Sequence, residues 1–352
     1  MINLFGLTLT QLQDLCLTEG FPKFTAKQIC DWLYKKRVLS IDEMTNLSLK
    51  VRARLNETAF IGRSFPVDCQ TSKDGTRKYL FKVAEEADHS SHQYVEAVMI
   101  PDADRATLCI SCQRGCKMGC HFCVTGKQGF HGHLSAADIL NQIFSIPESE
   151  MLTNVVYMGM GEPMDNYDNV LASTQVLTSG WGLAWSPHRI TVSSVGITPM
   201  LKRFIEESEC HVAVSLHNPY HQERLQLMPM EKTYPILSCL DMLKQYDWTG
   251  QRRISFEYTM FRGVNDDLGH AAELVRLFRG PNRTGHLFCR VNLIRFHESE
   301  GVDLHTSSQQ TMEQFQKYLN DHGVICTIRA SRGEDIMAAC GLLAGQAEKT
   351  NK

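Results

Sequence analysis

The sequence Thr107-Leu-Cys-Ile-Ser111 runs directly into Cys112-Gln-Arg-Gly-Cys-Lys-Met-Gly-Cys-His-Phe-Cys123. The first five residues are largely apolar or β-branched, which is typical of a buried strand. The second segment carries three cysteines with the spacing C-x3-C-x2-C, at Cys116, Cys120 and Cys123. Thiolates gathered in a compact loop suit an iron–sulfur cluster, so we expect a metal site at the carboxyl end of this strand.

Further β-type runs alternate with amphipathic helical segments along the rest of the chain. Six β-then-α units in succession predict an α/β fold with a parallel sheet, closed or partly closed into a (β/α)6 barrel. In such barrels the functional side chains lie at the carboxyl ends of the strands. The runs are Thr107–Ser111, Asn154–Met158, Arg189–Ser193, His211–Ser215, Arg253–Tyr258 and Arg290–Ile294, and one more strand is expected at Val324–Arg329.

The first hundred residues have a different pattern. Residues 1–58 predict a small helical module with helices at Leu9–Leu17, Ala26–Lys36 and Leu47–Leu55, the second capped by Thr25. Residues 59–105 predict a β-rich extension with strands at Lys78–Val83 and Tyr94–Ile100 and a hairpin tip over Glu85–Gln93. We therefore expect four parts: the module, the extension, a core barrel over 106–330 and a tail over 331–352.

Composition narrows the class of protein. The 352 residues include 43% hydrophobic and 21% charged residues, enough for a sizeable core. No apolar run reaches the ~18 residues that a bilayer span needs, and no basic leader precedes an apolar stretch, so we expect a cytoplasmic protein without a membrane partner. Thirteen cysteines do not form the pattern of a secreted disulfide scaffold. The net charge of -3 does not by itself indicate nucleic acid.

Basic residues nevertheless gather around the second predicted helix. They lie close to aromatic side chains, which suits contacts to phosphates and bases, although a solvated helix face would have the same pattern. The residues are Lys23, Lys27, Lys35, Lys36 and Arg37, with Phe24, Trp32 and Tyr34 beside them.

Three thiolates around a four-iron cube leave one iron open to another ligand. The spacing resembles that of the radical S-adenosylmethionine (SAM) superfamily, in which SAM binds the open iron, and Phe122 occupies the usual aromatic position. The segment Gly159-Met-Gly-Glu-Pro163 resembles the superfamily's GGEP element, in which Gly161 and Glu162 contact the SAM amino group. A zinc site is the alternative, but it needs a fourth ligand, and His121 is awkwardly placed between two cysteines. Cys112 offers a competing C-x3-C register with Cys116.

A narrower resemblance extends over nearly the whole chain. Its motifs are Arg105-Ala-Thr-Leu-Cys109, Gly115–Cys123, Thr125-Gly-Lys-Gln-Gly-Phe130, Gly159–Pro163, Ser215-Leu-His217, Val291-Asn-Leu-Ile294, Arg332-Gly-Glu-Asp-Ile336 and Ala338-Ala-Cys-Gly341. With these motifs the sequence resembles the RlmN family of RNA adenine C2-methyltransferases, sister to the C8-methylating Cfr enzymes. The Thr125–Phe130 string favours the C2 branch. The resemblance implies methylation of an adenosine in 23S rRNA, and some members of the family also methylate the anticodon-adjacent adenosine in tRNA, so both rRNA alone and rRNA with tRNA are open as substrates.

The resemblance also assigns catalytic roles. Adenine C2 has no electron pair for polar methyl transfer, so a radical route is required. Cys340 would take a methyl group from one SAM, and a second SAM would supply the radical that activates it. Cys109 would release the product through a transient disulfide with Cys340, and either Glu96 or Cys109 would take the C2 proton. On pattern alone Cys109 is a packing residue, Cys340 incidental, and Glu96 an outward strand residue.

The remaining expectations concern SAM and partners. Ser193, Ser215, Leu216, His217 and His297 resemble the family's SAM contacts. The chain departs from the family at Ser111-Cys-Gln-Arg114, usually Ser-Ser-Gln-Val, and at Arg295-Phe-His-Glu298, usually Pro-Trp-Asn-Pro, which puts the contact from His297 in doubt. An electron donor such as flavodoxin or ferredoxin and a monomeric state are expected. The alternatives are C8 methylation and a non-catalytic iron–sulfur RNA-binding protein.

Overall fold

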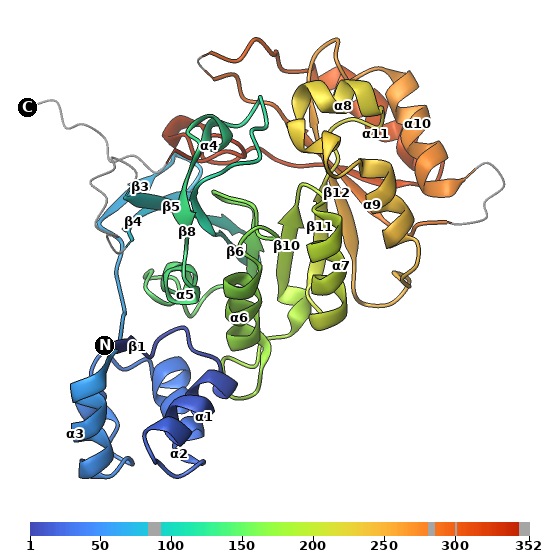
Figure 1. The fold of residues 1–352 in the computed structure, drawn as a ribbon. Helices are drawn as coiled ribbons and strands as arrows, with labels where there is room; N and C mark the ends of the chain where they lie inside the picture. Colours follow the sequence, from blue (N-terminus) through green and yellow to red (C-terminus); the bar gives the residue numbers. More distant parts are fainter. Residues whose placement is uncertain (84–92, 281–285, 300, 345–352) are drawn as a thin grey trace, which may run out of the picture.

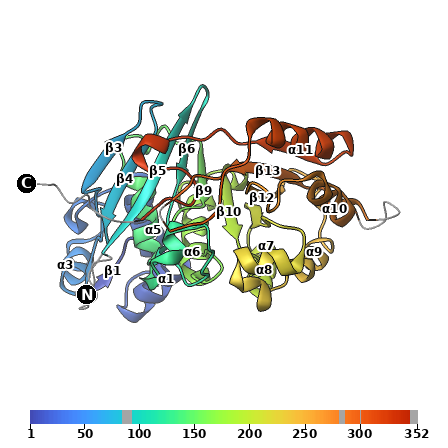
Figure 2. The same ribbon diagram turned by 90° about the horizontal axis from the view of Figure 1, so that it is seen from above.

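The computed structural model describes residues 1–83, 93–280, 286–299 and 301–344. One ten-stranded sheet forms the centre of the molecule, in the order β14-β13-β12-β11-β10-β9-β6-β5-β4-β3. Figure 1 shows the chain colours passing in sequence across it, and Figure 2 shows its strands in one curved row. The sheet is open, with β14 and β3 at its edges, so the expected barrel is partial.

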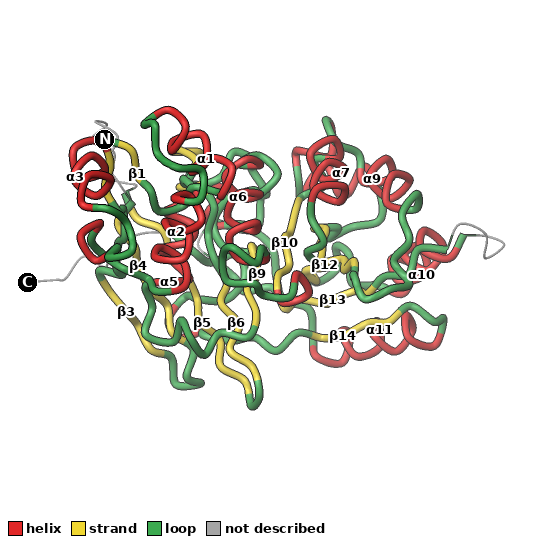
Figure 3. The backbone as a smooth tube through the Cα atoms, turned by 90° about the horizontal axis from the view of Figure 1, so that it is seen from below, coloured by secondary structure: helices red, strands yellow, loops and turns green. Residues whose placement is uncertain are grey.

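Seven neighbouring strands of this sheet run parallel, and six of them match the predicted units. Their bounds are β6 (Arg105–Cys109), β9 (Asn154–Tyr157), β10 (Ile190–Ser194), β11 (His211–Ser215), β12 (Ile254–Met260), β13 (Arg290–Arg295) and β14 (Ile325–Ile328). The helices between and after them are α5 (Ala136–Phe144), α6 (Tyr167–Thr178), α7 (Thr198–Glu207), α8 (His221–Leu227), α9 (Ile236–Leu243), α10 (Leu268–Arg279) and α11 (Gln309–Asp321), with short 3-10 turns at Pro187–Arg189, Pro229–Lys232 and Glu334–Ile336. Figure 3 shows the helices flanking the strands. Alternation of buried strands and one-sided helices therefore predicted the core correctly.

The β extension continues the same sheet. Strands β5 (Tyr94–Asp102), β4 (Arg77–Lys82) and β3 (Asp68–Thr71) are antiparallel, and β5 pairs with β6 so that Val98 lies opposite Cys109. Residues 59–105 thus extend one wall of the barrel. The sequence analysis missed β3, and most of the expected hairpin tip over Glu85–Gln93 lies outside the described residues.

The helical module comprises α1 (Leu9–Thr18), α2 (Thr25–Cys30) with a π-helical turn over Asp31–Lys35, a 3-10 turn at Ile41–Glu43 and α3 (Leu49–Thr58), joined by the paired strands β1 (Ile2–Asn3) and β2 (Ala59–Phe60). Thr8 and Gln11 form a capping box at α1. The expected cap by Thr25 is wrong: Thr25 is a buried first residue of α2, and Phe24 precedes it without a side-chain cap bond.

The module packs against the barrel beneath α5 and α6 (Figure 1). The Tyr34 ring lies 6.2 Å from that of Phe144 at the end of α5 and 6.0 Å from that of Trp181. Arg37 donates to the Ser149 hydroxyl at 2.9 Å, so it belongs to this interface and not to an open basic surface. None of the helices in the described ranges is long and apolar enough to span a bilayer.

Candidate active site

A cavity lies at the carboxyl ends of the parallel strands, where the strand pattern predicted a site. It encloses about 1250 Å³ of empty space, part of it open to solvent. Five cysteines line it: Cys109 at the end of β6, Cys116, Cys120 and Cys123 in the loop that follows, and Cys340 in the tail. The structure thus brings together all five cysteines to which the sequence analysis gave a role.

The cysteine loop is held by backbone hydrogen bonds. It passes between β7 (Gln113–Gly115) and the short helix α4 (Val124–Lys127), and β8 (Phe130–His133) pairs back onto β7. Gly126 packs closely under the loop, because a Cβ there would lie 3.2 Å from the Cys120 carbonyl oxygen. Cys112 is buried, does not line the cavity and donates its N–H to the Met160 carbonyl at 2.8 Å. The competing register through Cys112 is therefore not the one that faces the cavity.

The three loop thiols suit an iron–sulfur cube. Burial raises the pKa of Cys116 to about 12, and burial and the neighbouring thiols raise that of Cys120, so bound cations would be needed to hold them as thiolates. Among the described residues, no three His, Cys, Asp or Glu side chains converge as ligands of one ion would. Thiols spaced around a cavity fit a cube in which each cysteine binds a different iron.

Glu162 follows β9 and lies on the cavity wall. Its carboxylate accepts the N–H groups of Val195 at 2.9 Å and Met164 at 3.1 Å, and burial raises its pKa to about 7. Gly161 has φ +100°, and a Cβ there would lie 2.5 Å from the Gln113 Cβ. The glycine lets the turn approach β7, where Gln113 Oε1 accepts the Glu162 N–H at 2.8 Å. The GGEP-like element is thus braced by the cysteine loop.

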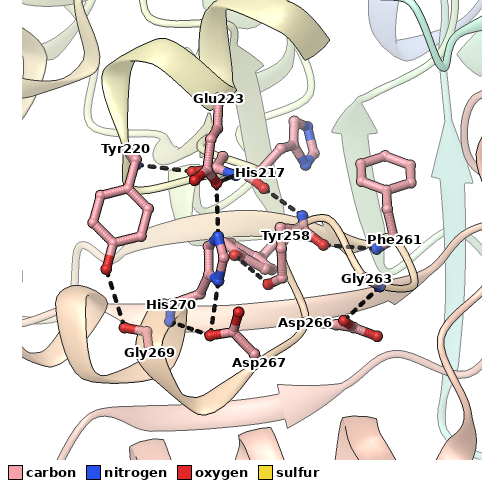
Figure 4. Close-up of polar contacts among 12 residues, drawn as sticks. His217, Tyr220, Glu223, Tyr258, Phe261, Gly263, Asp266, Asp267, Gly269 and His270 are labelled. Atoms are coloured by element: carbon pink, nitrogen blue, oxygen red, sulfur yellow. Dashed lines mark hydrogen bonds and ion pairs between the residues drawn. The ribbon is translucent and has the colours of Figure 1, made fainter.

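His217 also lines the cavity, in a strained backbone conformation with φ +55°. Its ring Nδ1 accepts the Thr259 N–H at 2.9 Å. Its carbonyl accepts the Asn265 amide at 2.5 Å, a contact of the network in Figure 4. Burial, together with the nearby positive charge of Arg224, lowers the pKa of His217 to about 3. The ring is therefore a neutral, fixed group at the cavity, with the Phe122 ring 4.9 Å away.

The other expected SAM contacts divide into two groups. Ser193 and Ser215 line the cavity at the ends of β10 and β11. Leu216 instead has a fully buried side chain that is not on the cavity wall. His297 also lies off the wall, with Nε2 2.9 Å from the Ser331 hydroxyl, and Phe296 lines the cavity there. The departure at Arg295–Glu298 thus replaces a polar contact with an aromatic one.

The two outlying cysteines share a charged neighbour that the sequence analysis missed. Arg329, just after β14, lines the cavity with Cys109 and Cys340, and its positive charge lowers the pKa of both thiols. Burial acts more strongly in the opposite direction and raises the pKa of Cys109 to about 12. Glu257 in the middle of β12 pairs with Arg329 at 3.7 Å, and Glu257 Oε2 is buried without a hydrogen-bond partner. Glu257 is a charged residue in an otherwise largely apolar strand, and this was the sequence signal from which a buried partner such as Arg329 could have been predicted.

A buried arginine fixes the strand ends behind the cavity. Arg224 of α8 is fully buried and donates to the carbonyls of Val195 at 2.9 Å, Ser215 at 2.8 Å and Leu216 at 2.9 Å. It also pairs with the buried Glu231. This role of Arg224 could not be predicted from the sequence, because the residues of α8 have the pattern of an ordinary polar helix.

A partial parallel barrel with three loop thiols and a glycine–glutamate turn on one cavity defines a radical SAM protein. The Radical SAM superfamily model matches residues 110–275, and the model described as the ribosomal RNA large subunit methyltransferase N-terminal domain matches residues 2–61. A solved structure titled a radical SAM methyltransferase, from Sphaerobacter thermophilus, superposes with a TM-score of 0.86 at 35% identity, covering 98% of this chain and 100% of that one.

The chain belongs to the RlmN family. It is 56% identical over 350 residues to a probable dual-specificity RNA methyltransferase RlmN of Bacteroides fragilis, covering 99% of this chain and 98% of that one. It is 40% identical to the dual-specificity RNA methyltransferase RlmN of Syntrophus aciditrophicus, covering 98% and 97%. The resemblance found in the motifs is thereby confirmed, and membership of the superfamily implies SAM and a [4Fe-4S] cluster as cofactors.

Proposed function

We propose that the protein is a SAM-dependent methyltransferase that places a methyl group on C2 of an adenosine in RNA. The observation that carries the proposal is the shared cavity: Cys109 and Cys340, from distant parts of the chain, line it with Cys116, Cys120 and Cys123. Full-length similarity to proteins named dual-specificity RNA methyltransferases supports an RNA substrate. A non-catalytic iron–sulfur protein would have no use for two further thiols there.

The loop thiols would hold the cluster, and Glu162, Ser193, Ser215 and His217 would surround SAM. When bound, this pair of cofactors supplies a transferable methyl group and, after one-electron reduction, a 5'-deoxyadenosyl radical. Cys340, which is solvent-exposed at the cavity, would be the nucleophile that accepts the methyl group of one SAM. The S-methyl group on Cys340 would give up one hydrogen atom when a second SAM is cleaved, and its carbon would then bond to adenine C2. Each turnover thus uses two SAM molecules.

Product release depends on Cys109. Its sulfur would bond to the Cys340 sulfur as the carbon–sulfur bond breaks, which leaves a disulfide in the enzyme. The released CH2 carbon would take up a proton to complete the methyl group on RNA, and the unpaired electron of the adduct would return to the cluster. Arg329 favours the thiolate forms that this exchange needs. The C2 proton goes to Cys109 or Glu96, and of these Cys109 lines the cavity. Reduction of the disulfide completes the cycle.

The proposed substrates are 23S rRNA and the anticodon-adjacent adenosine of tRNA, with a flavodoxin or ferredoxin as electron donor to a cytoplasmic monomer. The adenine must leave its stack to reach the cavity. Lys23, Phe24 and Lys27 are exposed together on the helical module, and we assign RNA contacts to them. Lys35 and Lys36 pair with Asp31, so they contribute less free charge.

The test uses protein reconstituted with iron and sulfide without oxygen, then incubated with reductant, labelled SAM and ribosomal RNA. We expect 2-methyladenosine in the RNA and 5'-deoxyadenosine in solution. Cys340→Ala abolishes methylation, whereas Cys109→Ala traps a covalent enzyme–RNA adduct because attachment proceeds and release does not. Cys69→Ala removes an exposed cysteine away from the cavity and serves as the control. A C8-methylated product, or no SAM cleavage with the cluster loaded, overturns the proposal.

A further inference from the structure

The tail that carries Cys340 is bound through its backbone to the helix that follows the cluster loop. The Val124 N–H donates to the Gly341 carbonyl at 2.9 Å. The Thr125 hydroxyl donates to the Leu343 carbonyl at 2.7 Å, and the Gln128 amide donates to the Ala344 carbonyl at 2.8 Å. Three successive contacts therefore join α4 to the residues just after Cys340.

The tail is held from the other side by Glu96 of β5. Glu96 is 3% exposed; its Oε2 accepts the Ala344 N–H at 2.8 Å, and its Oε1 lies 3.3 Å from Lys78 Nζ. Both carboxylate oxygens are thus engaged behind the cavity, and Glu96 is not among the residues that line it. This is the geometry of an anchor for the tail rather than of a base in contact with substrate.

We infer that Thr125, Gln128 and Glu96 form a tail clamp that binds the backbone of residues 341–344 and positions Cys340 at the cluster cavity. The inference rests on the proposed function, in which Cys340 carries the methyl group. Thr125 lies in α4 and Gln128 is the residue that caps its carboxyl end with helical backbone angles, so the two side chains, three residues apart, project from the same side of this turn. Thr125 and Gln128 belong to the Thr125–Phe130 motif, so the clamp gives this motif a role in binding the tail. Binding of the cluster by the three cysteines does not by itself explain the motif.

The clamp also links two chemical centres. Cys123 directly precedes α4, and Lys127 donates its N–H to the Cys123 carbonyl at 3.1 Å, so the helix that holds the tail starts at a cluster ligand. Order in the cluster loop is therefore transmitted to Cys340 through α4. Thr125 lines the cavity and also hydrogen-bonds the Cys123 thiol, whereas Gln128 does not line the cavity. A clamp weakened at Gln128 therefore lets Cys340 leave its position without removing a contact to a cluster ligand.

The first test compares Thr125→Val and Gln128→Ala with the wild-type holoenzyme. Amide hydrogen exchange in residues 341–344 should become about fivefold faster for each lost hydrogen bond. Methyl groups transferred to RNA per 5'-deoxyadenosine formed should fall several-fold in both variants, and in Gln128→Ala, which lies off the cavity wall, iron content and the KM for SAM should stay unchanged. Gln245→Ala, which changes an exposed glutamine beyond α9 at the other end of the barrel, is the matched control. Unchanged exchange in both clamp variants overturns the inference.

The second test separates the anchor from a base at Glu96. Glu96→Gln keeps an oxygen that accepts the Ala344 N–H, whereas Glu96→Ala removes it. Each change is combined with Lys78→Met, because Lys78 pairs with Glu96 and would otherwise be left as a buried cation without its partner. If Glu96 anchors the tail, Glu96→Gln should keep most of the methyl transfer and the slow amide exchange of residues 341–344, whereas Glu96→Ala should lose both. If both variants lose methyl transfer equally while amide exchange stays unchanged, the anchor role is contradicted. If wild-type enzyme methylates no RNA, the proposed function fails, and hydrogen exchange still decides whether the clamp exists.

Discussion

Arg224→Met is the substitution from which we expect the largest loss of stability. Arg224 and Glu231 are both fully buried and paired, and the guanidinium also holds the carbonyls of Val195, Ser215 and Leu216 at 2.8 to 2.9 Å. Methionine fills a similar volume but donates nothing. The change leaves a buried carboxylate without its cation, which costs about 3–5 kcal/mol of unfolding free energy.

The assay is equilibrium urea unfolding, with the free energy extrapolated to water. Arg203→Met is the control, because Arg203 of α7 pairs with Glu207 at the surface, where loss of an ion pair changes the unfolding free energy far less than loss of a buried one. Adding Glu231→Gln to Arg224→Met should recover part of the loss, since the uncompensated charge is gone. A loss for Arg224→Met no larger than that of the control would refute the argument that the pair braces the strand ends.

Three shorter predictions concern the cavity. Burial lowers the pKa of His217 to about 3, so below pH 6.5 the unfolded chain binds a proton at this histidine and the folded chain does not. The unfolding free energy of the wild type should therefore fall by up to about 1.4 kcal/mol per pH unit between pH 6.5 and 3. Unfolding measured across this pH range should show no such fall for His217→Asn. Arg329→Gln removes the charge that lowers the pKa of Cys340, so alkylation of Cys340 by iodoacetamide at pH 8, followed by mass spectrometry, should slow several-fold; an unchanged rate contradicts this. Gly159→Ala places a Cβ 2.7 Å from the Ile110 carbonyl oxygen and should cost about 1–3 kcal/mol of unfolding free energy, whereas a thermal midpoint equal to wild type would show that the turn can shift.

The parts of the fold that sequence predicted best are those with a strong local signal. The run Thr107–Ser111 and its successors are apolar and short, and each precedes a one-sided helix, so the parallel sheet and the position of the cavity followed from general rules. Thr25 shows where a local signal misleads: a good capping residue became the buried first residue of the helix because packing required it there. β3 was missed because its four residues carry no apolar alternation.

The site was predictable where residues lie close in sequence. The three loop cysteines and Glu162 could be found from spacing and a glycine turn. The residues around Cys340 and its tail could not be predicted, because they come from distant parts of the chain. Glu257 lies in β12, Glu96 in β5 and Arg329 directly after β14, and only the folded chain brings them together. His297 was expected at the cavity by analogy with the family, but its ring bonds to Ser331 while Phe296 takes the wall.

The pairing of β5 with β6 determines which parts of the chain can be exchanged between relatives. Five residue pairs join these strands, and Val98 and Ile100 of β5 form part of the cavity wall next to Cys109. A barrel excised at residue 106 would lose that wall and expose a bare strand edge open to aggregation. Chimeras intended to move substrate preference from one relative to another should therefore transplant residues 59–105 together with the barrel and join the chains within the helical module instead.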